Sequence, residues 1–140
     1  MQQHSRNALF LAQNLTELGI KVNYPGLENH PDHLLLKSMM NPGFGFGGML
    51  SFDAGSAEKA AELMELMETE GVGYLAVSLG YFKTLFSNSG KSTSSEVPEE
   101  KQKEMGLTEG LIRFSVGLDH DIERTFSKME KCIRLAGLIK

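Results

Sequence analysis

"GLIRFSVGLDHD", residues 110 to 121, contains the strand pattern that decides the fold of this 140-residue chain. Side chains along a strand point alternately to its two faces, so Leu111 to Leu118 predicts a strand with one wholly apolar face. That face carries Ile112, Phe114, Val116 and Leu118. The other face carries Leu111, Arg113, Ser115 and Gly117. It therefore places an arginine beside two small residues.

Arg113 can be interpreted in two ways from the residues alone. An arginine on a half-buried strand is most often on the solvated side of a sheet. A guanidinium above Ser and Gly also has room for a planar anion, and its rigid fork of donors suits a carboxylate or phosphate better than lysine does. Ser78 in "AVSLG" is a candidate companion, because the ends of strands are places where scaffolds present binding groups.

The composition is typical of one globular domain. Hydrophobic residues make up 41% and charged residues 23%, which excludes a disordered chain. We expect no membrane segment, because the apolar runs are short, and no signal peptide, because Gln13 and Asn14 interrupt the first apolar run. The net charge of −4 and the scattered basic residues argue against nucleic-acid binding. Cys132 is the single cysteine, so we expect a reducing, cytoplasmic setting.

The chain alternates predicted helices and strands. We expect strands at "IKVNYP" (20–25), "GGMLSFDA" (47–54), "YLAVSL" (74–79) and "LIRFSVGL" (111–118). Predicted helices are an opening helix ending at Gly19, "HPDHLLLKSMM" with Pro31 in its first turn, a helix from Ser56 to Gly71, a short one between Pro98 and Gly106, and a last one starting near Asp119 or Asp121.

These elements predict the fold class. Residues 86–100 are rich in Ser, Gly and Lys and are expected to form a long exposed loop. The strands interleaved with helices predict an α/β two-layer sandwich, with about four mainly antiparallel strands and helices on one side.

Two glycine-rich segments do not support phosphate binding. "NPGFGFGG", residues 41 to 48, is followed by a strand and not by a helix, so a tight turn with Phe44 and Phe46 packing nearby is favoured. "GKST" at 90–93 lacks the earlier glycine of a P-loop, because Leu85 stands there.

No metal site or nucleophile is predicted. His30 and His33 are three residues apart, but two histidines without a third ligand favour packing and capping over zinc binding. Cys132 falls in the last helix near Ile133, where packing is favoured over nucleophilic reactivity.

Several motifs taken together resemble one enzyme family. "YPGLENHPDH", "FGFGGMLSFD", "AVSLGYFKTL" and "PEEKQKEMGLTEGLIRFSVGLD" are similar in order and spacing to the C-terminal domain of Cys/Met metabolism pyridoxal-phosphate (PLP) enzymes. The resemblance runs from about Asn7 to the final helix. It implies an opening helix over 1–19 and an α/β substrate-closing domain over 20–140, like the small domain of fold-type I (aspartate aminotransferase-like) enzymes. It also implies that the large cofactor-binding domain lies outside these residues.

The resemblance also assigns roles to residues. Arg113 matches the family's substrate-carboxylate arginine, and Ser78 matches the serine beside that carboxylate. Val77 stands where cystathionine enzymes commonly have glutamate, which is similar to methionine γ-lyases and sulfhydrylases. The run "SLGYFKTLFSNSGKSTSSE" resembles the plant-type methionine γ-lyase branch. One departure is Ser92-Thr93, where many members have a Thr-His pair.

The implied activity is α,γ-elimination of methionine to a thiol, ammonia and 2-oxobutanoate, with PLP bound mainly by the large domain. The catalytic Schiff-base lysine belongs to that domain, so the chain alone is expected to be inactive. A PLP-dependent γ-replacement enzyme, such as cystathionine γ-synthase or a homoserine-ester sulfhydrylase, and a non-catalytic amino-acid-binding or interaction module remain the alternatives. The expected partners are an amino-acid substrate, the large domain of the same polypeptide and further copies in a homotetramer.

Overall fold

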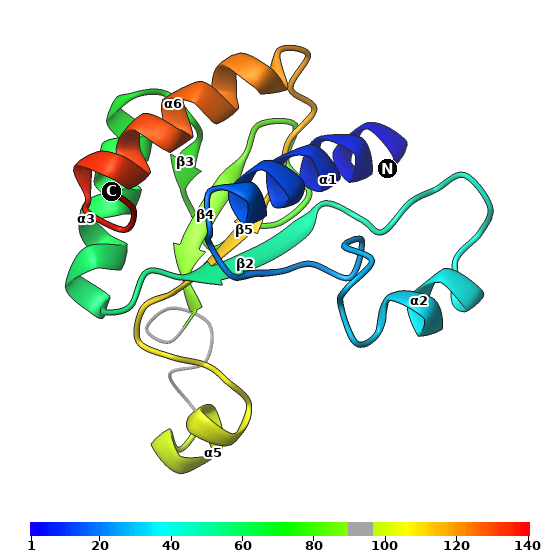
Figure 1. Ribbon diagram of the computed structural model, residues 1–140, viewed down its shortest axis with the longest axis horizontal. Coiled ribbons are helices and arrows are strands. Elements are labelled where there is room, and N and C mark those ends of the chain that lie inside the picture. Colours follow the sequence, from blue (N-terminus) through cyan, green and yellow to red (C-terminus); the bar gives the residue numbers. More distant parts are fainter. Residues whose placement is uncertain (90–96) are drawn as a thin grey trace.

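A five-stranded sheet lies at the centre of the computed structural model, which describes residues 1–89 and 97–140 (Figure 1). The strands are β1 (Val22–Asn23), β2 (Met49–Asp53), β3 (Tyr74–Leu75), β4 (Leu85–Asn88) and β5 (Leu111–Ser115). Their order across the sheet is β1-β2-β5-β4-β3. Only the β3–β4 pair is parallel among the described strands; the other three pairs are antiparallel, as the sequence predicts.

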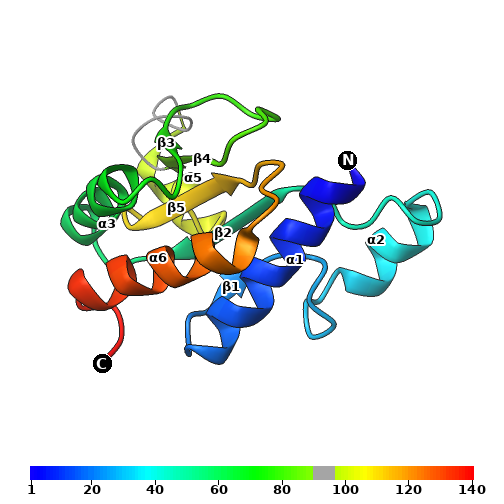
Figure 2. The same cartoon turned by 90° about the horizontal axis from the view of Figure 1, so that it is seen from above.

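Three long helices cover one face of this sheet (Figure 2). They are α1 (Gln2–Glu17), α3 (Ala57–Thr69) and α6 (Ile122–Leu135), whereas the short α2 (His33–Met39) and α5 (Glu99–Glu104) project away from the body of the domain (Figure 1). This arrangement confirms the predicted two-layer α/β fold. In the described part of the chain, no helix combines the length and apolar character that crossing a bilayer requires.

The core forms between the three long helices and the apolar face of β5. Ile112, Phe114 and Val116 are completely buried. The Phe114 ring lies 5.3 Å from that of Phe52 on β2 and 5.8 Å from that of Phe86 on β4. β5 therefore packs against aromatic side chains of both neighbouring strands and lies at the centre of the hydrophobic core.

The helix ends follow the sequence signals. The Ser56 hydroxyl accepts a hydrogen bond from the backbone N–H of Lys59, and the Asp121 carboxylate accepts one from that of Arg124. The glycine after α3, Gly71, has a φ of 72°, the left-handed conformation that terminates helices. Pro31 is a small exception, because α2 begins at His33 after the N-cap Asp32, so the proline precedes the first turn.

The largest difference from expectation is β4. Residues 86–89 are not part of an exposed loop: Leu85–Asn88 is a strand, and all four of its residues are buried. The β4 segment is covered on both faces. Its sequence therefore shows no polar-apolar alternation that would predict a strand. The rest of the expected loop, including the "GKST" segment at 90–93 and Ser92-Thr93, lies outside the described residues up to position 96.

The other differences concern where strands end. The predicted strand at 74–79 stops at Leu75, and the one at 111–118 stops at Ser115. Leu118 is therefore 48% exposed and does not continue the apolar face. Gly117 passes so close to the backbone at 82–84 that a Cβ would lie 2.5 Å from the Phe82 carbonyl oxygen. This crossing bends the chain out of the sheet.

The glycine-rich segment is a tightly turned approach to β2, as the sequence predicts. Gly43, Gly45 and Gly47 all have φ values between 75° and 82°. The buried Tyr24 hydroxyl donates to the Gly47 carbonyl at 2.9 Å, which holds the turn against the core. Phe46 stacks on His33 with ring centroids 4.7 Å apart, whereas Phe44 is 51% exposed, so only one of the two rings packs.

Tyr24 makes fold stability depend on alkaline pH. Burial raises its pKa to about 12, above the value of about 10 in an unfolded chain. The folded state therefore favours the neutral phenol, and its contribution is complete below pH ~10 and is lost as pH rises toward ~12. We expect wild type to lose up to about 3 kcal/mol more unfolding free energy than Tyr24→Phe over this interval.

Denaturant unfolding of both proteins across that pH interval measures this difference. At neutral pH the wild type should be more stable, by about 1 kcal/mol for the lost hydrogen bond. Parallel stability curves for the two proteins up to pH ~12 would contradict the role of Tyr24.

Candidate functional site

Arg113 occupies the middle of the sheet on the face opposite the hydrophobic core. It is paired directly with Ser51 of β2 on one side and with Ser87 of β4 on the other. Directly opposed residues of antiparallel strands point to the same face, so the arginine stands in a row with two serines. Its side chain is half-buried.

The guanidinium of Arg113 reaches across the sheet to the loop that follows β3. Its Nη2 donates to the Val77 carbonyl at 3.1 Å, and the Ser78 carbonyl lies 3.5 Å away. The loop therefore lies within reach of the central strand, although β3 itself is at the edge of the sheet.

A second side chain of β5 holds the same loop. The buried Ser115 hydroxyl accepts a hydrogen bond from the backbone N–H of Gly80 at 2.9 Å. The polar face of β5 thus fastens the segment Val77–Gly80 at both ends. The three residues singled out from the sequence, Arg113, Val77 and Ser78, lie together, although the contacts use the carbonyl groups of Val77 and Ser78. The Val77 side chain itself is 55% exposed.

Among the described residues, no acidic side chain forms an ion pair with Arg113. In the described part of the chain, the ion pairs are Lys131–Glu70 and Arg134–Glu130, and neither includes Arg113. Burial lowers the pKa of Arg113, because it makes the charged form less favourable. A half-buried cation without a counter-charge favours the binding of an anion.

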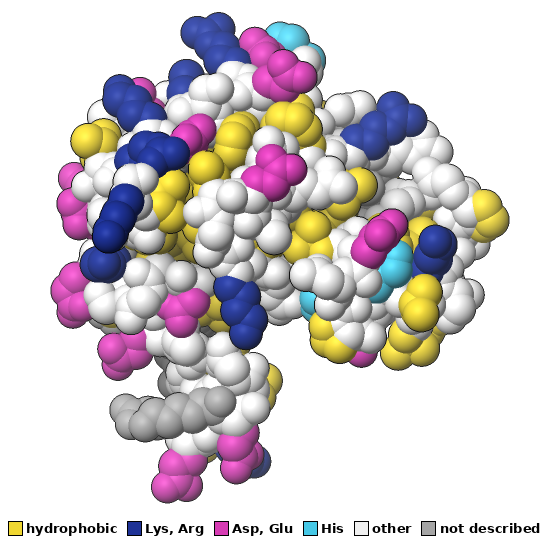
Figure 3. Space-filling view, viewed as in Figure 1, with side chains coloured by type: hydrophobic (Ala, Val, Ile, Leu, Met, Phe, Trp, Pro, Cys, Tyr) yellow, Lys and Arg dark blue, Asp and Glu magenta, His cyan; other side chains and the backbone are white. Residues whose placement is uncertain are grey.

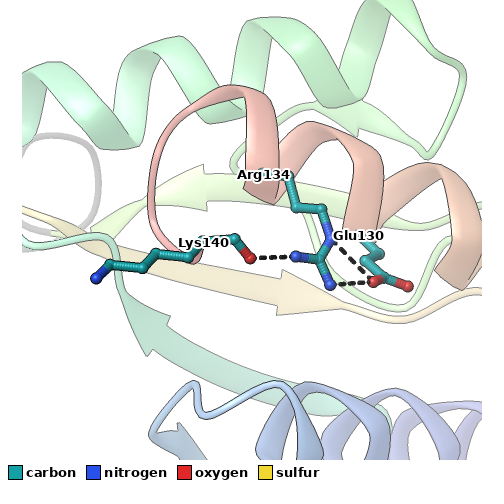
Figure 4. A network of polar contacts seen from close by, with 3 residues as sticks. All are labelled: Glu130, Arg134 and Lys140. Atoms are coloured by element: carbon teal, nitrogen blue, oxygen red, sulfur yellow. Dashed lines mark hydrogen bonds and ion pairs between the residues drawn. The ribbon is translucent and has the colours of Figure 1, made fainter.

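Arg134 forms a hydrogen bond from each of its three guanidinium nitrogens (Figure 4). Its Nε and Nη2 donate to Glu130 Oε1 at 3.1 and 2.7 Å, and its Nη1 donates to the Lys140 carbonyl. In contrast, Arg113 Nε is buried and has no hydrogen-bond partner among residues 1–89 and 97–140. The bonding capacity of Arg113 is therefore only partly used.

A cavity of about 740 Å³ opens beside Arg113 on the side of β1 and β2. Its polar lining includes Lys21, Asn23, His30, Ser51 and Asp53. The volume is in the range of small-molecule sites.

Another cavity, of about 520 Å³, lies near the edge strand β3, and several of its polar side chains have partners. Lys83 Nζ donates to the Tyr74 hydroxyl at 2.8 Å, and Glu68 accepts from the backbone N–H of Leu75 at 3.1 Å. The carboxylate of Asp119 accepts from the backbone N–H of Asp121 and from the Thr125 hydroxyl. The Arg113 region is the better candidate for recognising a ligand, because it holds a half-buried guanidinium whose Nε has no hydrogen-bond partner in the described part of the chain.

The other sequence candidates have structural roles. His33 Nδ1 lies 2.9 Å from the Pro25 carbonyl, and His30 Nε2 lies 2.8 Å from Asn23 Oδ1. A search of the described residues finds no cluster of three or more side chains suited to a metal ion. Cys132 is completely buried, and this burial raises the pKa of its thiol. These surroundings fit packing roles for His30, His33 and Cys132 better than reactive ones.

The lysine side chains that the structure describes lie mostly at the surface. Of these lysines, Lys128 is half-buried and the others are exposed. A lysine that forms an imine near neutral pH needs a lowered pKa. The shifts at Lys83 and Lys131 go the other way: hydrogen bonds to Tyr74 and Glu70, respectively, raise the pKa of these two lysines.

Two residues of this site were not identified from the sequence. Ser115 stands two positions after Arg113, so the strand period already placed it on the correct face. Ser87 could not be placed, because the strand that contains it was expected to be a loop. The Ser87 hydroxyl is buried and has no hydrogen-bond partner among the residues that the structure describes.

Comparison with known proteins identifies the relatives of this chain. A protein-family model described as "Cys/Met metabolism PLP-dependent enzyme" matches residues 1–128. Methionine γ-lyase of Arabidopsis thaliana is 46% identical over 132 residues, which is 94% of this chain and 30% of that protein. Cystathionine γ-lyase of Bacillus subtilis is 42% identical over 96 residues, which is 69% of this chain and 24% of that protein.

A solved structure shows the same fold. A Campylobacter jejuni protein assigned as an O-acetylhomoserine (thiol)-lyase, whose crystal structure contains pyridoxyl-lysine phosphate, superposes with a TM-score of 0.85 at 31% identity. The match covers 96% of this chain and 31% of that protein. The chain thus spans about a third or less of the length of the relatives it matches.

The hydrogen bond between Ser115 and Gly80 gives a test of how the loop is held. We expect Ser115→Ala to speed hydrogen exchange of the Gly80 amide about fivefold, the effect of one lost hydrogen bond. NMR-detected exchange measures this, with the Leu118 amide as internal control, because it donates to the Phe82 carbonyl and not to Ser115. Equal exchange of the Gly80 amide in both proteins would contradict the assignment.

Proposed function

The chain belongs to the Cys/Met metabolism family of PLP-dependent enzymes, and we propose that it is the substrate-closing C-terminal domain of a methionine γ-lyase-like enzyme. One observation carries the proposal. The half-buried Arg113 has no acidic partner in the described part of the chain, and it lies against the loop of Val77 and Ser78. A domain with an unneutralised guanidinium at this position is suited to holding an amino acid by its carboxylate.

Arg113 is proposed to bind the substrate α-carboxylate through the outer nitrogens of its guanidinium. Two parallel N–H donors fit the two oxygens of a carboxylate and fix its orientation as well as its position. Such fixing reduces the orientational freedom that the reacting atoms would otherwise have to lose. Ser78 is proposed to lie beside the same carboxylate.

Val77 is proposed to contribute to substrate choice. Its side chain is apolar, half exposed and directly before Ser78. A thioether side chain can lie against valine without loss, whereas the charged far end of cystathionine would lose water without gaining a partner. This contrast favours methionine over cystathionine as substrate.

The proposed reaction converts methionine and water to methanethiol, ammonia and 2-oxobutanoate. PLP, held by the remainder of the polypeptide, would supply the electron sink that such an elimination requires. The lysines with described side chains do not fit the imine role, so we assign the Schiff-base lysine to the large domain. In this division of labour, the present chain orients the substrate.

A γ-replacement enzyme is the second candidate. The likeness to the Campylobacter jejuni O-acetylhomoserine (thiol)-lyase favours it, because an apolar residue before Ser78 also suits a small activated homoserine. Product analysis of the complete enzyme with and without added thiol separates the two. Release of 2-oxobutanoate from methionine without thiol supports elimination, whereas a thioether formed only with thiol supports replacement.

The proposal extends to the setting of the complete enzyme. We propose a cytoplasmic homo-oligomer, a tetramer, in which the large domain and further copies cover surfaces that this chain leaves open. The apolar residues exposed near the outer end of α2, among them Leu34, Leu35 and Met39, form one such surface (Figure 3). Charged residues of both signs intersperse over α3 and α6 (Figure 3).

Replacing Arg113 tests the proposed anchor. In the complete enzyme, we expect Arg113→Ala to raise KM for methionine about 100-fold, because a charge-assisted pair of hydrogen bonds is lost. Arg113→Lys should recover only part of this loss, because an ammonium keeps the charge but not the planar fork. Steady-state kinetics measure both.

Arg124→Ala is the matched control, since Arg124 is an exposed arginine of α6 on the other face of the sheet. It should leave KM within about twofold of wild type, the range of surface substitutions. An unchanged KM in Arg113→Ala would rule out the anchor role.

The assignment of the Schiff-base lysine to another domain has its own test. We expect the 140-residue chain, mixed with PLP, reduced with borohydride and weighed by intact mass spectrometry, to show no stoichiometric adduct at one site. The complete enzyme treated in the same way is the positive control. A single modified lysine in this chain would contradict the proposed division between the domains.

A further inference from the structure

Two buried side-chain atoms without a hydrogen-bond partner stand out in the described part of the chain: Ser87 Oγ and Arg113 Nε. They belong to residues that are paired directly across β4 and β5. Buried polar groups in folded proteins almost always have partners, so two such atoms on one cross-strand pair call for an explanation.

Ser87 lies next to Arg113 on the same face of the sheet. It is the β4 residue paired with Arg113, and it is only 3% exposed. The Cβ atoms of such a pair are about 5 Å apart, within reach of a hydrogen bond between their polar atoms. The serine hydroxyl is therefore a candidate partner for the arginine side chain.

The two atoms are chemically complementary. Nε of a guanidinium carries one N–H and can only donate, whereas a serine hydroxyl can accept and can rotate to suit its donor. The guanidinium lies next to the Val77 carbonyl, to which Nη2 donates a hydrogen bond at 3.1 Å. A movement of the arginine that brings Nε within hydrogen-bond distance of Ser87 Oγ would give both buried atoms a partner.

We propose that Ser87 is the positioning residue of Arg113: when a carboxylate binds to the outer nitrogens, Nε donates to Ser87 Oγ and holds the guanidinium plane. This inference rests on the proposed role of Arg113 as the carboxylate anchor. It adds the residue that sets the orientation of the fork. Binding of the ligand and satisfaction of the two buried atoms then occur together.

The proposal separates the effects of Ser87 on stability and on binding. A serine that serves only the fold stabilises the free protein through its hydroxyl, as Ser115 does by accepting from Gly80. In the described part of the chain, the Ser87 hydroxyl has no hydrogen-bond partner, so its removal should cost little stability. Ser87→Ala should therefore keep or raise Tm, while Ser115→Ala should lower it.

Acetate binding to the 140-residue chain, followed by the NMR signal of the Arg113 Nε–H group, tests the proposal. Chloride at equal ionic strength is the control for screening, and Arg113→Lys assigns the signal. In wild type, acetate should move the Nε proton downfield as the bond to Ser87 forms. Ser87→Ala should abolish this movement and weaken acetate binding about tenfold, the effect of one hydrogen bond to a charged group. Ser87→Thr keeps the hydroxyl and should restore both.

The outcomes distinguish this inference from the proposed function. If acetate leaves every Arg113 signal of wild type unchanged, the carboxylate-anchor role fails and the inference falls with it. If wild type responds but Ser87→Ala binds acetate equally well with the same Nε shift, only the positioning role is overturned. A fall in Tm of Ser87→Ala equal to that of Ser115→Ala would likewise overturn it, because the hydroxyl would then serve the fold.

Discussion

The placement of a guanidinium on the central strand of the sheet is the constraint on which the polar half of this domain depends. Arg113 is half removed from water and has no acidic partner in the described residues, so its charge must be stabilised by carbonyl groups or by an anion from outside. The carbonyls of Val77 and Ser78 meet part of this requirement.

The same strand organises the opposite face by ordinary packing. Ile112, Phe114 and Val116 are completely buried beneath the helices, and Phe114 touches aromatic rings of both neighbouring strands. Burial of this face holds the register of β5, and a slip by one residue would turn Arg113 into the core. The hydrophobic core therefore determines where the arginine stands, and the site owes its geometry to residues that never contact a ligand.

The polar face of the sheet combines a half-buried arginine, the neighbouring apolar side chain of Val77 and an adjacent cavity, while the lysines with described side chains are at least partly exposed. It spans about a third or less of its relatives. The apolar side chains exposed on α2 and along the loop after β3 are suited to burial against further protein.

Local sequence patterns were enough to predict the α/β class, both ends of α3, the start of α6, the two faces of β5 as far as Ser115 and the choice of Arg113 as the most informative residue. These features depend on periodicity and capping, which neighbouring residues settle among themselves. The family and the grouping of Arg113 with Ser78 came from motifs read together. Only the tertiary structure decided that Leu85–Asn88 is a buried strand, because a strand covered on both faces has no alternation to detect. Only the structure could place the Ser87 hydroxyl beside Arg113 with no hydrogen-bond partner among the described residues, because the neighbours of a side chain on a sheet come from strands distant in sequence.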